Sequence, residues 1–136
     1  MAAHYKSFRE LDVEVLGIST DSVCSHKIFA ETSPSAQKVQ YPLLSDPTRE
    51  ISACYGALNP ETGFATRTTF IVSPAGDVEY FCKYPEPVGR NVEELIRMIQ
   101  AIRFTDDTGL GAPAGWRPGE LGEPGLSTDW DMVGKI

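Results

Sequence analysis

Apolar side chains recur every three or four residues in four stretches of the chain, and this spacing predicts a helix in each. The stretches cover residues 5–11, 22–33, 47–58 and 91–102. No Ser, Thr, Asp or Asn stands before the first stretch to cap its free amide groups. The last stretch begins at a capping Asn91 and carries one long apolar face: Val92, Leu95, Ile96, Ile99 and Ile102.

The two middle helices carry clear start and stop signals. Asp21 or Ser22 caps the earlier one, which ends near Pro34 because the residue before a proline disfavours helix. Its apolar face consists of Val23, Ile28 and Phe29. The later helix has Pro47 in its first turn. Its stripe, which turns Cys54 toward the interior, consists of Ile51, Cys54, Tyr55 and Leu58.

Runs rich in β-branched and aromatic residues predict four strands, at 13–19, 39–45, 67–73 and 78–83. The last two form a hairpin joined by Ser-Pro-Ala-Gly-Asp. Because helices and strands alternate along most of the chain, we expect an α/β fold. From Asp106 the chain is rich in Gly and Pro and loses its periodicity, which predicts a domain over 1–105 and an arm or tail over 106–136.

Composition excludes several classes of protein and partner. The net charge of −7 argues against nucleic acid and against an anionic membrane surface as partners. No signal peptide or spanning segment is evident. Three widely spaced cysteines without a CxxC pair favour a reducing cytoplasm and predict neither a metal site nor a cofactor. His4 and His26 lack a partner at a functional spacing, so we expect surface or packing roles for them.

Three segments carry a more specific signal because they follow one another in a fixed order: VLGISTDS, PVGRNVEE and PAGWRPG. Together they resemble peroxiredoxins of the alkyl hydroperoxide reductase C/thiol-specific antioxidant kind, over residues 4–119. The resemblance implies a thioredoxin-like fold that reduces hydrogen peroxide and organic hydroperoxides in antioxidant defence and redox homeostasis. It also implies a homodimer or larger homo-oligomer and an external thiol reductant such as a thioredoxin-like protein.

The family's nucleophile has no counterpart in this sequence. In the family, a strand leads to a Pro-Thr-Cys segment at the start of the helix before EVLGIS, and MAAHYKSFREL resembles the rest of that helix. We therefore expect an N-terminally truncated chain that lacks the first strands, the central strand before the nucleophile and the peroxidatic residue. Such a chain is expected to be inactive alone. It would be the downstream part of a selenocysteine-containing peroxiredoxin if a UGA codon precedes Met1. A frameshift, a pseudogene or a contig edge are the alternatives.

Two arginines match positions of the family's catalytic site. Arg67, in ATRTTFIV, matches the arginine that contacts the peroxidatic sulfur and the substrate, and Arg90, in PVGRN, matches a supporting arginine. Ala112 stands where many members carry a resolving cysteine. Cys24 and Cys82 are then the local thiols available for that role, although an inert thiol is the simpler interpretation of each.

Without a central strand, the resemblance predicts two half-sheets in place of one sheet. The expected pairs are 13–19 with 39–45 and 67–73 with 78–83. Because the strand edges beside the gap have unpaired backbone groups and apolar residues such as Leu16 and Ile18, we expect a marginal or partner-dependent fold. A different interpretation is a non-catalytic interaction or assembly module that pairs with full-length subunits.

Overall fold

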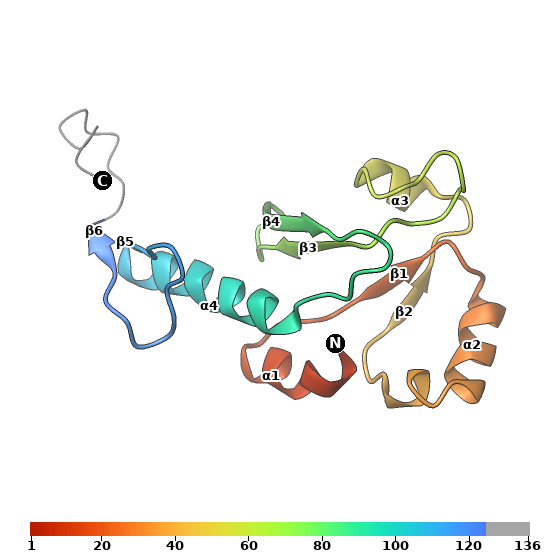
Figure 1. The fold of residues 1–136 in the computed structure, drawn as a ribbon, viewed down its shortest axis with the longest axis horizontal. Helices are drawn as coiled ribbons and strands as arrows, with labels where there is room; N and C mark the ends of the chain where they lie inside the picture. The colour runs from red at the N-terminus through yellow and green to blue at the C-terminus, as the bar shows by residue number, and fades with distance from the viewer. Residues whose placement is uncertain (125–136) are drawn as a thin grey trace. The chain divides into compact units, whose positions relative to one another are not determined.

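The computed structural model describes residues 1–124, which fall into two compact units that divide after Arg90. The first unit contains η1 (Ala2–His4), α1 (Tyr5–Glu10), β1 (Gly17–Ser19), α2 (Val23–Thr32), η2 (Ala36–Lys38), β2 (Leu43–Ser45), α3 (Glu50–Cys54), β3 (Thr68–Val72) and β4 (Val78–Lys83) (Figure 1). The second contains α4 (Val92–Thr108), β5 (Leu110–Gly111) and β6 (Glu123–Pro124). None of the helices within residues 1–124 is both long and apolar enough to cross a membrane.

The strands of the first unit form two separate two-stranded sheets. β1 pairs in parallel with β2, and Ile18 lies opposite Leu44. β3 pairs antiparallel with β4, with an irregularity between Ile71 and Val72. These are the two predicted pairs, which are therefore confirmed. Leu16 and Ile18 are 53% and 43% exposed, as expected for an open apolar edge.

Strands β1 and β2 are shorter than predicted, and Pro42 accounts for the limit. Gly17 donates its amide hydrogen to the Pro42 carbonyl oxygen at 2.9 Å, one step before the paired strand begins. Pro42 has no amide hydrogen to return, so the parallel ladder does not extend toward residue 39. The regular pairing is therefore confined to three residues on each strand.

The caps of α2 and α4 are where the sequence predicts them, whereas α1 has no side-chain cap, also as predicted. Ser22 accepts a hydrogen bond from the Ser25 amide at 3.1 Å, and α2 ends at Thr32, before the Ser-Pro pair. Asn91 accepts one from the Glu94 amide at 3.1 Å. Helix α4 continues through Thr108, and the predicted boundary between domain and tail after residue 105 stays a prediction.

The third predicted helix is wrong in its start and in the direction of Cys54. Arg49 adopts a left-handed conformation with φ of 65°, so α3 begins only at Glu50 and Pro47 lies outside it. The carboxylate of Asp46 accepts hydrogen bonds from the Ser52 amide at 2.8 Å and the Ser52 hydroxyl at 2.7 Å. This anchor buries Ser52 and leaves Cys54 exposed, opposite to the prediction.

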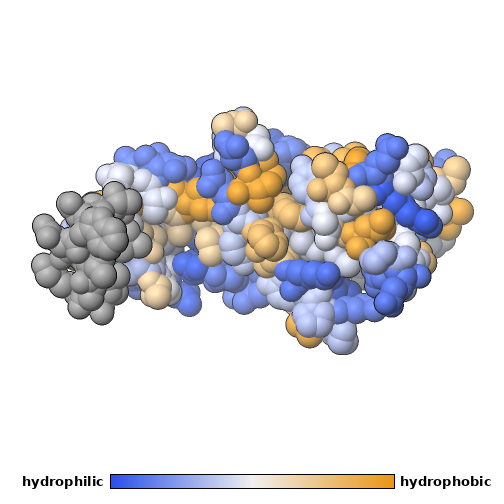
Figure 2. Space-filling model, turned by 90° about the horizontal axis from the view of Figure 1, so that it is seen from above, coloured by the Kyte–Doolittle hydropathy of each residue, from blue (hydrophilic) through white to orange (hydrophobic). Residues whose placement is uncertain are grey.

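Each unit has its own small set of buried side chains, while many apolar residues reach the surface (Figure 2). The buried apolar residues of the first unit are Phe8, Val15, Ala36 and Ala57. Those of the second are Leu95, Ile99, Ala101 and Trp116. The Trp116 ring stacks on Phe104 with centroids 4.7 Å apart.

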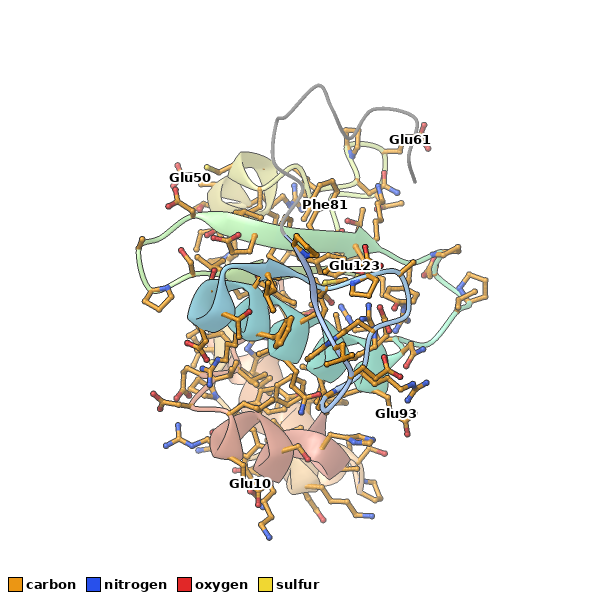
Figure 3. All side chains as sticks on the ribbon, turned by 90° about the vertical axis from the view of Figure 1, so that its left-hand side faces the viewer. Glu10, Glu50, Glu61, Phe81, Glu93 and Glu123 are labelled. Atoms are coloured by element: carbon orange, nitrogen blue, oxygen red, sulfur yellow. The ribbon has the colours of Figure 1, made fainter. Side chains whose placement is uncertain are left out.

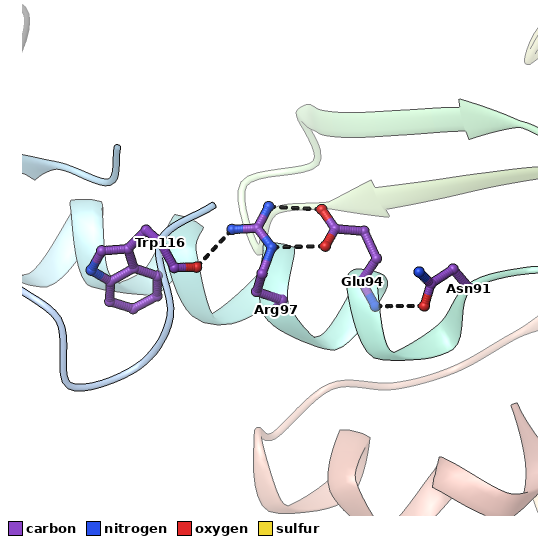
Figure 4. A network of polar contacts seen from close by, with 4 residues as sticks. All are labelled: Asn91, Glu94, Arg97 and Trp116. Atoms are coloured by element: carbon purple, nitrogen blue, oxygen red, sulfur yellow. Dashed lines mark hydrogen bonds and ion pairs between the residues drawn. The ribbon is translucent and has the colours of Figure 1, made fainter. Parts of the chain in front are cut away.

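A polar network fastens the segment after α4 to that helix (Figure 4). Arg97 donates two hydrogen bonds of 2.7 Å to the Glu94 carboxylate and one of 2.9 Å to the Trp116 carbonyl oxygen. The Trp116 indole donates to the Glu120 carbonyl oxygen at 3.2 Å. Residues 110–124 thus pack on α4 by their own contacts, and Trp130 lies outside the described residues.

Candidate functional site

The β3–β4 hairpin positions several polar side chains by its register. Thr69 and Cys82 are direct cross-strand partners. Just before β3, the Arg67 carbonyl oxygen accepts the Tyr84 amide hydrogen at 2.9 Å, which continues the pairing by one residue on each strand. Because side chains alternate along a strand, Arg67 and Thr69 extend from the same face of the hairpin, as do Cys82 and Tyr84.

Arg90 binds this face of the hairpin. Its Nε donates a hydrogen bond to the Thr69 hydroxyl at 2.9 Å, and its Nη2 donates to the Thr68 carbonyl oxygen at 3.4 Å. Burial, followed by the positive charge of Arg67, lowers the pKa of Arg90 from its ordinary value. The negative forms of Cys82, Tyr41 and Tyr84 act in the opposite direction. The two predicted site arginines, separated by 23 positions in sequence (90 − 67), are therefore within electrostatic range of each other.

Arg67 has a buried hydrogen-bond donor that no group within residues 1–124 satisfies. Its side chain is half-buried, and within residues 1–124 its Nε atom is buried without a hydrogen-bond partner. A buried donor without a partner costs about 1–3 kcal/mol. A partner from outside the described residues, such as a ligand oxygen, would remove this cost.

The start of the chain lies beside the same arginines. Burial, followed by the positive charge of Arg90, lowers the pKa of the Met1 amino group from its ordinary value of 8.0. Residue 1 therefore lies close to the Arg90 guanidinium. We call the group of Arg67, Thr69, Cys82 and Arg90 the arginine site. Its net character is cationic, which suits an anionic nucleophile or a developing oxyanion.

The remaining predicted position lies elsewhere in the chain. Ala112 follows β5 in the second unit, where it is half-buried and contributes no sulfur. Its suggested equivalence to a resolving cysteine stays a prediction. Among residues 1–124 no group of three or more His, Cys, Asp or Glu side chains could hold a metal ion.

Two arrangements in the first unit were missed by the sequence analysis. One is the location of Cys82 opposite Thr69, on the hairpin face that Arg90 binds, which could have been found by counting the predicted hairpin outward from its turn. The other is at the end of β1, where the Ser19 hydroxyl donates to the Asp21 carboxylate and contacts His26 Nε2, both at 2.7 Å. Helix α2 brings His26 back to Ser19 across seven positions, a contact that spacing alone does not reveal.

Comparisons with known proteins agree with one another on the family that the chain resembles. The model of the AhpC/TSA family matches residues 1–81. Alkyl hydroperoxide reductase C of Pseudomonas aeruginosa (strain UCBPP-PA14) is 36% identical over 136 residues, which cover 99% of this chain and 71% of that protein. Peroxiredoxin-2 of Cricetulus griseus is 40% identical over 119 residues, which cover 85% and 60%.

Solved structures point the same way. The reduced 2-Cys peroxiredoxin of Plasmodium vivax matches with a TM-score of 0.83 at 30% identity, over 89% of this chain and 64% of that one. The AhpC of Enterococcus faecalis matches with a TM-score of 0.77 at 37% identity, over 79% and 65%. These matches confirm the predicted α/β fold of the peroxiredoxin, thioredoxin-like kind. The chain spans only about two thirds of the length of these relatives.

Proposed function

Because the chain belongs to the AhpC/TSA family, we propose that it is part of a peroxiredoxin-type peroxidase that reduces hydrogen peroxide and organic hydroperoxides. The observation that carries this proposal is the proximity of Arg67 and Arg90 to each other, and of Arg90 to residue 1 at the start of the chain's first helices. In the proposal, the nucleophile is a cysteine thiolate or a selenocysteine selenolate encoded shortly ahead of Met1. A helix that continues into α1 would deliver it to the two arginines.

The residues of the arginine site suit the chemistry of peroxide reduction. The nucleophile forms a bond to one peroxide oxygen while the O–O bond breaks, and the electron pair leaves on the other oxygen, which then takes a proton. The Nε–H of Arg67 is a fixed donor for that departing oxygen. Arg90, held by Thr69, keeps a second positive charge beside the nucleophile. An external thiol, of a thioredoxin-like protein, then reduces the oxidised nucleophile.

The first test is to read the genomic frame upstream of Met1. The proposal expects a codon for cysteine, or an in-frame UGA, a few codons ahead of Met1. Codons for a strand rich in β-branched residues should precede it. An upstream frame that encodes neither would exclude the nucleophile from this place. The chain would then be better explained as a non-catalytic module that pairs with full-length subunits.

The second test is an activity assay on a chain extended upstream through a cysteine at that position. Peroxide consumption in the presence of a thiol donor should fall about 10²–10³-fold in Arg67→Gln, since a preorganised donor contributes about that much to a charged transition state. The activity of Arg90→Gln should fall less, because the hydrogen bonds of Arg90 go to Thr69 and Thr68 of the hairpin. Arg103→Gln, an exposed arginine of α4, is the matched control and should be unchanged. Equal activity of Arg67→Gln and the parent would refute the role of Arg67.

A further inference from the structure

Arg90 is bound to the hairpin chiefly through the side chain of Thr69. The Thr69 hydroxyl oxygen accepts the Arg90 Nε–H at 2.9 Å, whereas the bond from Arg90 Nη2 to the Thr68 carbonyl oxygen is 3.4 Å long. Thr69 is half-buried within β3 and pairs directly with Cys82. Because side chains alternate along a strand, the neighbouring Phe81 lies on the other face, where it is 66% exposed (Figure 3). The hairpin thus presents the Thr69 hydroxyl at a fixed place.

The charge of Arg90 is not balanced by a carboxylate among residues 1–124. None of the salt bridges in this part of the chain includes Arg90. The groups that favour its charged form are Cys82, Tyr41 and Tyr84, while burial and Arg67 oppose it. Both of its hydrogen bonds go to neutral oxygens, one of a hydroxyl and one of a carbonyl group. A half-buried cation next to a second cation is therefore held by acceptors that carry no charge.

The chemical type of the acceptor decides what the guanidinium can still do. A carboxylate binds a guanidinium more strongly, but its negative charge also offsets the field of the cation at a neighbouring site. A hydroxyl fixes the direction of the Nε–H and leaves the positive charge in place. A preorganised cation assists a reaction because it needs no rearrangement while negative charge develops.

We propose that Thr69 is a positioning residue for peroxide reduction, whose hydroxyl orients the Arg90 guanidinium and leaves its positive charge available to the anionic nucleophile. This inference rests on the proposed function and adds the group that fixes one of its two arginines. Thr69 itself does not contact the peroxide in this proposal, because it acts through Arg90.

Matched variants separate the hydroxyl group from the fold. Thr69→Val removes the hydroxyl and keeps a β-branched side chain suited to a strand, whereas Thr69→Ser keeps the hydroxyl. Thr68→Val is the control in β3, because the Thr68 hydroxyl contacts the Thr66 hydroxyl at 2.7 Å and the substitution keeps the Thr68 carbonyl oxygen. Circular dichroism establishes that each variant has the secondary structure content of the parent.

The first measurement uses the 136-residue chain and does not depend on the upstream nucleophile. NMR spectroscopy follows the exchange of the Arg90 Nε–H with water, and the signal is identified by its loss in Arg90→Lys. Thr69→Val should accelerate this exchange about tenfold or more, since a hydrogen bond to a charged group contributes at least that factor. Thr69→Ser and Thr68→Val should keep the slow exchange of the parent. An exchange rate in Thr69→Val equal to that of the parent overturns the proposal.

The second measurement uses the chain extended upstream through a cysteine. In Thr69→Val, peroxide consumption should fall about tenfold and the midpoint of its pH profile should move to higher pH, because a displaced guanidinium stabilises the thiolate less. Thr69→Ser should restore most of the rate. The double variant Thr69→Val/Arg90→Gln should be no slower than Arg90→Gln alone, since the hydroxyl acts through Arg90.

The outcomes of the two measurements distinguish this proposal from the proposed function. A full rate in Thr69→Val, or losses that add in the double variant, overturns the role of Thr69 while the peroxidase activity of the parent stands. An extended parent that consumes no peroxide refutes the proposed function instead. The exchange rate of the Arg90 Nε–H then still decides whether Thr69 holds the guanidinium.

Discussion

Helices α2 and α4 have the same kind of N-terminal capping hydrogen bond but differ in the burial of their apolar residues. Ser22 and Asn91 each accept a hydrogen bond of 3.1 Å from the amide three residues later. In α2, Val23, Ile28 and Phe29 are 71%, 60% and 52% exposed. In α4, Leu95, Ile99 and Ala101 are 2%, 6% and 7% exposed.

The difference teaches that a cap and a stripe determine where a helix forms, while burial depends on the surface that the rest of the chain offers. Helix α2 packs beside η2 and the two-stranded sheet, and an open pocket of about 330 Å³ remains there, lined in part by Val23, His26 and Val39. In the second unit, the Trp116 ring stacks on Phe104 of α4, and the Trp116 carbonyl oxygen accepts a hydrogen bond from Arg97. The apolar face of α2 is therefore only partly covered, whereas the segment that follows α4 in the chain packs on α4.

The largest expected effect comes from truncating matched apolar residues of the two helices. Leu95→Ala removes a nearly fully buried side chain and should lower the free energy of unfolding by about 2–5 kcal/mol. Phe29→Ala, on the exposed face of α2, should change it by less than about 0.5 kcal/mol. Urea denaturation followed by circular dichroism measures both. A Phe29→Ala cost that matched the Leu95→Ala cost would mean that the apolar face of α2 is covered in solution.

A smaller effect, equal in both helices, should follow from removing the caps. Ser22→Ala and Asn91→Ala each free one backbone amide and should each cost about 1 kcal/mol of helix stability. Hydrogen exchange of the first-turn amides of α2 and α4 measures the loss locally. Ser25→Ala is a useful control, because it removes a nearby hydroxyl but keeps the Ser25 amide that Ser22 binds. Protection factors that fall in one helix and not in the other would break the equivalence of the caps.

The smallest effect is a pH dependence confined to α4. Hydrogen bonds from Arg97 hold the pKa of Glu94 below its ordinary value of 4.5. The unfolded chain therefore takes up this proton at a higher pH than the folded chain does, so the stabilisation is present above pH 4.5 and is lost as the pH falls below it. Because the pair is partly exposed, the contribution is less than about 1 kcal/mol.

Comparing the parent with Glu94→Gln isolates this contribution, since other carboxylates titrate in both. The difference in unfolding free energy between the two chains should shrink between pH 6 and about pH 3. A constant difference across that range would show that the Glu94 charge has no part in holding Arg97.

The candidate site was only partly predictable. Arg67 and Arg90 were identified by resemblance of the motifs around them, and their mutual approach follows from a hydrogen bond between Arg90 and Thr69 that no local pattern encodes. Cys54 was assigned inward from helical spacing, but the left-handed Arg49 and the Asp46–Ser52 contacts shorten that helix and rotate it. Cys82 was one of two candidate thiols until the register of the hairpin placed it opposite Thr69.

The sequence by itself determined the local elements: the caps at Ser22 and Asn91, the stop before Pro34, the hairpin around its Gly-containing turn, and the partners of all four strands in the first unit. Such features depend on a few neighbouring residues or on motifs, so they can be read along the chain. Tertiary structure alone decided which apolar faces are buried and how Met1, Arg67 and Arg90 come together. Burial and electrostatic contact require residues distant in sequence to meet, and only the folded backbone brings them within reach.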